Sequence, residues 1–149
     1  MKKMLLAQLL CYCLAGCGGG ASSSGSGPSL TGNWQITFTQ TVGGGGSSSG
    51  PAVFVQSGSS VGGSVEVLPL GSTSTANCGY SAVVSGSISE TTVVLDLEYG
   101  TTIGNGEITQ PVKLTGDVNS ARTSMSGSYT VPVNDCSLGS GTWLATKTS

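Results

Sequence analysis

The chain has 149 residues, of which 8% are charged, and its formal net charge is −2. A chain of this length is sufficient for one domain. Apart from Lys2 and Lys3 near the N-terminus, three basic residues stand against seven acidic ones, which gives a net charge of −4 for the rest. This part has neither a basic patch nor a polybasic run. We therefore exclude nucleic-acid binding and electrostatic binding to anionic lipid.

The N-terminal segment has the pattern of an export signal. Lys2 and Lys3 precede an apolar run, residues 4–14, that is interrupted by Gln8. This run is shorter than the about 20 apolar residues needed to span a bilayer, and it has the length of a signal-peptide core. The run ends in Leu14-Ala15-Gly16-Cys17, which resembles the lipobox of bacterial lipoproteins.

The lipobox resemblance implies a processing reaction and a membrane anchor. The chain would be cut between Gly16 and Cys17, the Cys17 thiol would carry diacylglycerol, and the new amino group would be acylated with a fatty acid such as palmitate. Bulky residues precede Cys11 and Cys13, so these two cysteines do not fit the motif and would leave with the signal peptide. The alternative, a zinc site of three cysteines, has an unusual spacing and no histidine to complete it.

The domain organisation follows from this motif. We expect a lipoprotein signal peptide over residues 1–16, the lipidated cysteine with a Gly/Ser-rich tether over residues 17–29, and one β-domain over residues 30–149. The membrane is then a partner through the lipidated N-terminus, and the location is the bacterial cell envelope. Gly18, rather than an aspartate, follows the lipidated cysteine, which favours the outer membrane.

From residue 30 onward, apolar residues alternate with polar ones at the period of two that is typical of strands. The expected strands are residues 31–40, 52–57, 64–68, 80–89, 91–100, 106–116, 122–131 and 141–147. Breaks are expected at residues 43–51, 58–63 and 69–77. Pro111 predicts that its strand lies at an edge or contains a bulge, because proline cannot donate to a ladder.

About eight short strands with local turns predict an all-β fold, built as an antiparallel meander. No stretch of the mature region has the 3.6-residue period of a helix. Eight strands are enough for a small up-and-down barrel, and closure would remove exposed edges. A two-layer β-sandwich gives nearly the same sequence pattern and stays open as the alternative.

Two cysteines remain in the β-domain, Cys78 and Cys136. An exported protein meets an oxidising compartment, so an even pair of cysteines predicts a disulfide. Two free buried thiols are the alternative.

No catalytic constellation is present in the sequence. The chain has no histidine, so the usual Ser-His and Cys-His pairs cannot form. Asp96 and Glu98 are close in sequence, but they alternate with Leu95 and Leu97, which predicts a solvated outer face rather than a cleft. We expect no enzymatic activity, no metal site and no cofactor.

The segment LTGNW, residues 30–34, is similar to the G-x-W opening of lipocalins and to the first strand of avidin-like barrels. Both are families of small barrels that bind ligands in the lumen. The resemblance gives Trp34 and Trp143 two alternative roles, as plugs that close the barrel or as contacts to a small apolar ligand. We expect Trp34 to be a plug.

Three functions are compatible with these features. The first is a non-enzymatic, lipid-anchored envelope protein with a structural or protein-interaction role. The second is a lipocalin-like binder of a small apolar ligand. The third is a surface adhesin or inhibitor domain that uses its Ser/Thr/Gly-rich loops. A lumen filled by Trp34, Phe38, Tyr129 and Trp143 would favour the first function over the second.

Overall fold

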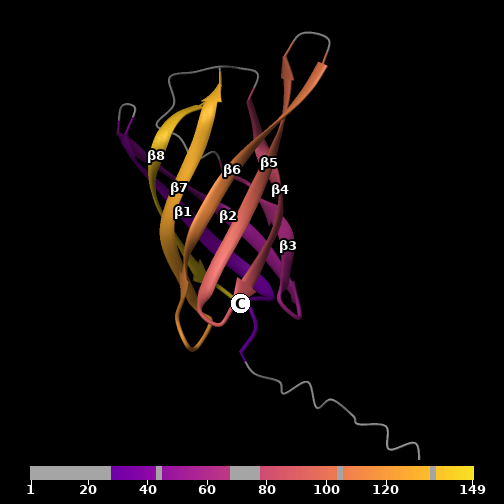
Figure 1. Ribbon diagram of the computed structural model, residues 1–149, viewed down its shortest axis with the longest axis vertical. Helices are drawn as coiled ribbons and strands as arrows, with labels where there is room; N and C mark the ends of the chain where they lie inside the picture. Colours follow the sequence, from indigo (N-terminus) through magenta and orange to yellow (C-terminus); the bar gives the residue numbers. More distant parts are fainter. Residues whose placement is uncertain (1–27, 43–44, 68–77, 104–105, 135–136) are drawn as a thin grey trace, which may run out of the picture.

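Eight antiparallel strands close into a barrel in sequence order, as the computed structural model shows (Figure 1). The structure describes residues 28–42, 45–67, 78–103, 106–134 and 137–149. The strands are β1 (Gly32–Val42), β2 (Gly46–Ser57), β3 (Ser60–Val65), β4 (Cys78–Ser89), β5 (Thr92–Ile103), β6 (Gly106–Val118), β7 (Ser124–Asn134) and β8 (Ser137–Lys147). The predicted all-β barrel is confirmed, and the alternative β-sandwich is wrong, because β1 pairs with both β2 and β8.

Two predicted breaks are wrong. β2 begins at Gly46, within the break expected at residues 43–51, and this segment pairs with β1 from Gly46 opposite Gln40 through Pro51 opposite Gln35. The turn expected at residues 58–63 is confined to residues 58–59, since β3 begins at Ser60. Both segments are rich in glycine and serine and carry no apolar alternation. They become strands because ladder hydrogen bonds use backbone groups: residues 46–51 pair with β1, and β3 pairs with both β2 and β4.

The interior of the barrel is filled by the apolar residues of each alternating strand. In β1, Trp34, Ile36 and Phe38 are at most 1% exposed, whereas Gln35 and Thr39 face solvent. The bulkiest of the fully buried side chains are aromatic: Trp34, Trp143, Tyr129, Phe38 and Phe54. Burial of one large apolar side chain stabilises a fold by about 1.5–3 kcal/mol. The lumen is therefore the hydrophobic core of this protein.

β6 and β7 approach each other closely at Gly116 and Gly127, which are paired directly. A Cβ atom on either glycine would clash with a backbone carbonyl of the facing strand, that of Ser126 or Thr115. Trp143 pairs with Gly127 from the other side, and its Nε1–H reaches past β7 to donate to the Thr115 carbonyl at 3.2 Å. The two glycines therefore allow the strands and the indole to pack together.

The barrel has two distinct ends. The first, which we call the N-terminal end, contains residues 28–31, the C-terminus and the connections β2–β3, β4–β5 and β6–β7 (Figure 1). There the Asn33 N–H donates to the Ser149 carbonyl at 3.1 Å, which joins the start of β1 to the end of the chain. At the opposite end, which we call the far end, β1, β3, β5 and β7 end and β2, β4, β6 and β8 begin.

Candidate functional site

Charged side chains on the barrel wall do not converge within the described part of the chain. Lys113 on β6 pairs with Asp96 on β5 at 3.4 Å, and both side chains are at least 40% exposed. Asp96 and Glu98 lie on the outer face, as predicted, because Leu95 and Leu97, which alternate with them, are fully buried. Among the described residues, no group of three or more His, Cys, Asp and Glu could hold a metal ion.

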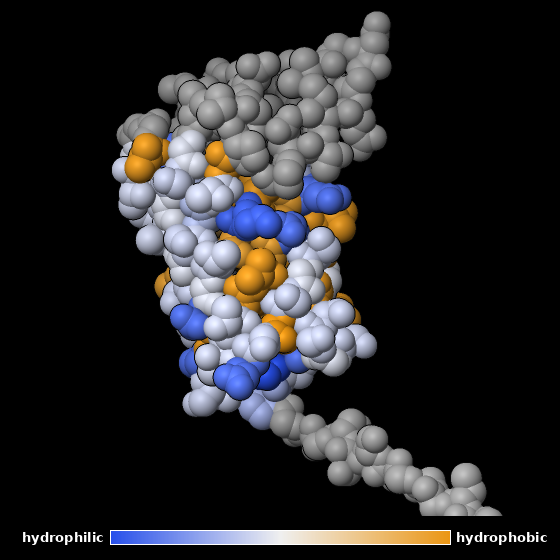
Figure 2. All heavy atoms as spheres, in the orientation of Figure 1, coloured by the Kyte–Doolittle hydropathy of each residue, from blue (hydrophilic) through white to orange (hydrophobic). Residues whose placement is uncertain are grey.

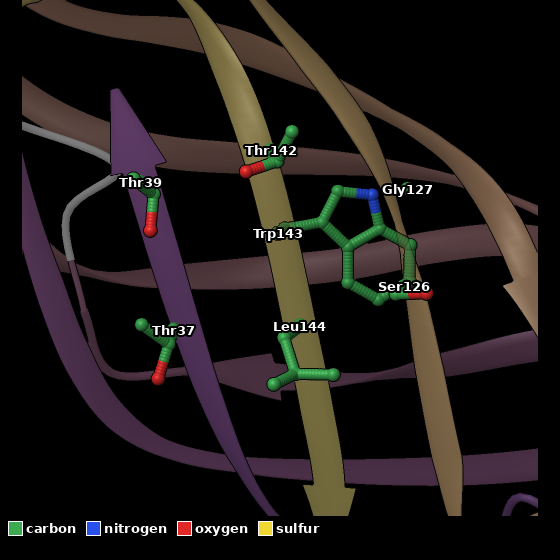
Figure 3. A pocket seen from close by; sticks show the side chains of 7 residues that line it. All are labelled: Thr37, Thr39, Ser126, Gly127, Thr142, Trp143 and Leu144. Atoms are coloured by element: carbon green, nitrogen blue, oxygen red, sulfur yellow. The ribbon is translucent and has the colours of Figure 1, made fainter. Parts of the chain in front are cut away.

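A groove of about 440 Å³ lies on the outer wall over β1, β8 and β7 (Figure 3). Its lining is Thr37 and Thr39 of β1, Thr142, Trp143 and Leu144 of β8, and Ser126 and Gly127 of β7. The hydroxyls can donate and accept hydrogen bonds, and Leu144 is 48% exposed. None of these groups titrates near neutral pH. The groove can therefore contact a neutral polar molecule, but its lining offers nothing for acid–base chemistry.

The face of the barrel seen in Figure 2 has an intermediate hydropathy. On the face seen in Figure 2 most atoms are pale, with separate blue and orange areas. In the described part of β1 and β8 the exposed residues are mostly polar, with threonines at positions 39, 41, 142 and 146, while Val42 and Leu144 are the exposed apolar ones. The wall thus offers neither a broad apolar surface nor a strongly charged one in this view.

Trp34 is buried near the N-terminal end of the lumen. Its Nε1–H donates to the Leu30 carbonyl at 2.8 Å, and its ring meets Phe54 edge-on with the centroids 5.7 Å apart. Lys147 covers the ring, with Nζ 5.9 Å from the centroid, and donates to the Ser29 carbonyl at 3.0 Å. The indole is thus held by Leu30 of the segment before β1, by Phe54 of β2 and by Lys147 of β8.

A second set of contacts secures the same segment. The Leu30 N–H donates to Oε1 of Gln56 at 3.0 Å, and Nη1 of Arg122 donates to the same oxygen at 2.8 Å. Leu30 itself is fully buried. Because the segment before β1, strand β2 and the β6–β7 connection all contribute, these contacts join distant parts of the sequence at the N-terminal end.

The lumen becomes more polar towards the far end. The Tyr99 hydroxyl donates to the Val67 carbonyl, and Gln40, which is 6% exposed, donates from Nε2 to the Val42 carbonyl at 2.9 Å. The buried Tyr129 hydroxyl has no hydrogen-bond partner among the described residues. Burial raises the pKa of both tyrosines, because it disfavours the charged phenolate.

The ladder between β6 and β7 stops before either strand does. Pairing runs from Val118 opposite Met125 to Lys113 opposite Thr130, yet β6 extends to Gly106. Continuing the same register would place Pro111 opposite Pro132. The pairing therefore ends two residues before a position where two prolines would face each other.

The direction of the two proline nitrogens explains why the ladder stops. Along a strand, the backbone N–H and C=O groups of successive residues point alternately to the two neighbouring strands. The Val118 N–H bonds to the Thr91 carbonyl beside β5, so the even-numbered residues of β6 point towards β5. The odd-numbered residues, including Pro111, therefore point towards β7. The Asn119 N–H bonds to the Ser124 carbonyl, so even-numbered residues of β7, including Pro132, point towards β6. Neither proline has an N–H to donate. Both hydrogen bonds of this pair are impossible, and a seam opens between the strands.

The seam separates β6 from β7 at the far end. Beyond Lys113, β6 remains paired with β5 without a register shift, as far as Gly106 opposite Ile103. In Figure 1 this β5–β6 ribbon projects away from β7 and β8. The edge position predicted for Pro111 is confirmed on its β7 side, and neither ladder of β6 contains the alternative bulge.

The predicted lipidation and disulfide residues fall mostly outside the described residues. Cys17 lies in residues 1–27 and Cys136 in residues 135–136, neither of which the structure describes. Cys78 begins β4 opposite Thr101, at the far end. β7 ends at Asn134 at the same end. The disulfide between Cys78 and Cys136 stays a prediction, as does lipidation of Cys17.

No protein-family model matches the chain, and neither a curated protein nor a solved structure matches it. Among the described residues, no helix has the length and apolar character required to cross a membrane. The resemblances to lipoproteins, lipocalins and avidins therefore stay predictions from the sequence motifs.

Proposed function

We propose that this protein is a non-enzymatic, lipid-anchored protein of the bacterial envelope that engages another envelope protein through its far end. The observation that carries the proposal is the opposition of the two ends (Figure 1). Residues 1–27, with the lipobox, join the barrel at the N-terminal end. The seam and the β5–β6 ribbon lie at the opposite end. A lipid on Cys17 would direct the far end away from the membrane.

The length of the tether supports this orientation. A Gly/Ser-rich coil spans roughly 5–6 Å multiplied by the square root of its residue number, which gives a mean reach of about 18 Å for residues 18–28. This distance leaves the barrel close to the membrane but free to rotate. The contacts of Leu30 with Gln56 and of Trp34 with Leu30 then fix where the tether enters the barrel.

The packing of the lumen favours an interaction role over binding of an apolar ligand. Trp34, Phe38, Tyr129 and Trp143 are each at most 2% exposed, and they fill space that a ligand would need. A ligand pocket commonly has a volume of about 300–1,000 Å³. Several of these aromatic side chains would have to move to create such a volume in the lumen.

Site-specific photo-crosslinking in intact bacteria tests the proposal. A photoreactive amino acid replaces Val42 or Glu66, which are exposed at the far end, or Ser59 or Thr91, which are exposed in turns at the N-terminal end. We expect adducts of discrete mass from the far-end positions and none from the matched positions. Cys17→Ser, which removes the anchor, should reduce the adducts. Equal adducts from both ends, or none from the far end, would contradict the proposal.

A further inference from the structure

The free edge of β6 has a defined set of hydrogen-bonding groups. By the alternation established at Val118, the odd-numbered residues of β6 direct their N–H and C=O groups towards the seam. Glu107 and Thr109 each offer a donor and an acceptor there, and Pro111 offers an acceptor alone. Among the described residues no strand pairs with this part of β6 from the β7 side. An unpaired edge of this kind is a template for another strand.

β7 does not pair with this edge within the described residues. The prolines 111 and 132 would face each other in the continued register, so the closing pair lacks both donors. The seam therefore begins at Pro111 and Pro132, because neither residue has an N–H for the hydrogen bond that this pair would form. A strand from another molecule has no proline that must face Pro111. It can pair with the backbones of Thr109 and Glu107 and needs no donor from Pro111.

The charges around the seam select the occupant. Glu98 is exposed and lies opposite Pro111 in the β5–β6 ladder, and Glu107 lies on the edge itself. Lys113 at the base of the seam is paired with Asp96. The remaining two basic residues of the described part, Arg122 and Lys147, are engaged at the N-terminal end.

We propose that an extended segment of a partner protein, carrying basic side chains, adds as a strand to the free β6 edge (residues 106–111) in the seam. This inference rests on the proposed function and gives the far end its mode of recognition, in which backbone hydrogen bonds supply affinity and charge supplies selectivity. A second copy of the chain is a poorer occupant. Antiparallel pairing of two such edges about Thr109 would place each Pro111 opposite Glu107 of the other copy, where the proline has no N–H to donate.

A synthetic peptide tests the inference on the full lipidated chain in detergent micelles. The probe is a fluorescent seven-residue peptide of alternating lysine and valine, and the measurement is its anisotropy on titration. Thr109→Pro removes a seam-facing donor but spares the β5 ladder, since residue 109 points away from β5. We expect binding to weaken about tenfold, as for the loss of one or two hydrogen bonds. Thr109→Val, which keeps the N–H, should bind within about twofold of the parent chain.

Two further probes separate strand addition from simple charge attraction. The same peptide with N-methyl groups on alternate residues cannot pair and should not bind, although its charge is unchanged. A glutamate–valine peptide should not bind either. Hydrogen exchange of the β6 amides should slow when the lysine–valine peptide is present, and circular dichroism should show that each variant retains the barrel.

Three results would overturn the inference. They are the absence of saturable binding of the lysine–valine peptide up to about 1 mM, equal binding by Thr109→Pro, and concentration-dependent dimerisation that Thr109→Pro abolishes. Crosslinks from Val42 or Glu66 that persist in Thr109→Pro would refute strand addition while leaving the proposed function intact. Absence of those crosslinks in the parent chain would refute the proposed function itself.

Discussion

Truncation of Trp34 should cost a large part of the stability of this barrel. The side chain is 1% exposed, donates to the Leu30 carbonyl at 2.8 Å and meets Phe54 edge-on. Trp34→Ala removes these contacts and leaves a cavity beneath Lys147. Large-to-small substitutions of buried aromatic residues cost about 3–5 kcal/mol. For a domain of this size each kcal/mol lowers Tm by about 3–5 °C, so Tm should fall by about 10–25 °C.

Urea unfolding followed by tryptophan fluorescence measures this loss, because Trp143 is the remaining tryptophan of the variant. Leu144→Ala is the matched control. It removes an apolar side chain from the same barrel, but one that is 48% exposed, and should cost less than about 1 kcal/mol. Trp34→Phe, which keeps a ring and loses the N–H, should lie between them. A Trp34→Ala variant that unfolds within about 1 kcal/mol of the parent would refute the role of Trp34 as a plug.

Three other outcomes follow from the sequence and the structure. Metabolic labelling with a palmitate analogue should mark the parent chain and not Cys17→Ser; label that persists in the variant would exclude lipidation at this residue. Non-reducing peptide mapping of exported protein should join Cys78 to Cys136, and closure of this loop of roughly 58 residues contributes at most about 4 kcal/mol. Recovery of both thiols in free form would contradict the disulfide. Burial raises the pKa of Tyr99 in the folded state above that in the unfolded chain. The contribution of Tyr99 to the free energy of unfolding is therefore fully present below about pH 10. It is lost at higher pH, by up to about 1.4 kcal/mol per pH unit, because the unfolded chain then releases the phenol proton more readily. Urea midpoints should therefore decline above pH 10, and less steeply in Tyr99→Phe; identical slopes would argue against this assignment.

Alternation along single strands was sufficient to predict much of the barrel. Trp34, Ile36 and Phe38 share one face in the sequence pattern, and all three are buried in the lumen. Leu95 and Leu97 likewise face inward. This success has a simple cause, since a strand with one buried face must repeat its apolar residues every second position.

The wrongly predicted segments lack that signal. β2 starts with glycine and serines at residues 46–50, and Gly62 and Gly63 lie in the middle of β3. These segments form strands because they pair with neighbouring strands. Some of those neighbours are distant in sequence, and others carry the apolar residues that these segments lack. Local alternation contains no information about such partners, so these strands emerge only from the closed sheet.

The seam was missed because it depends on two prolines together. Pro111 alone predicted an edge, whereas Pro132 carried no prediction. Both prolines are equally far from the β6–β7 connection, at Asn119 and Ser124 respectively. In a hairpin without register shifts, such residues face each other. A search for prolines placed symmetrically about a turn would have found the seam from the sequence.

The two ends of the barrel differ in a way that bears on function. At the N-terminal end, Leu30, Gln56 and Arg122 form a hydrogen-bonded closure around the entry of β1. At the far end, the β5–β6 ribbon continues past the last β6–β7 pair, although ending it there would remove an exposed edge. Unpaired edges favour aggregation, and proteins usually shorten or cover them. A ribbon that persists beside a seam held open by two prolines is better explained by use of that edge than by the needs of the fold.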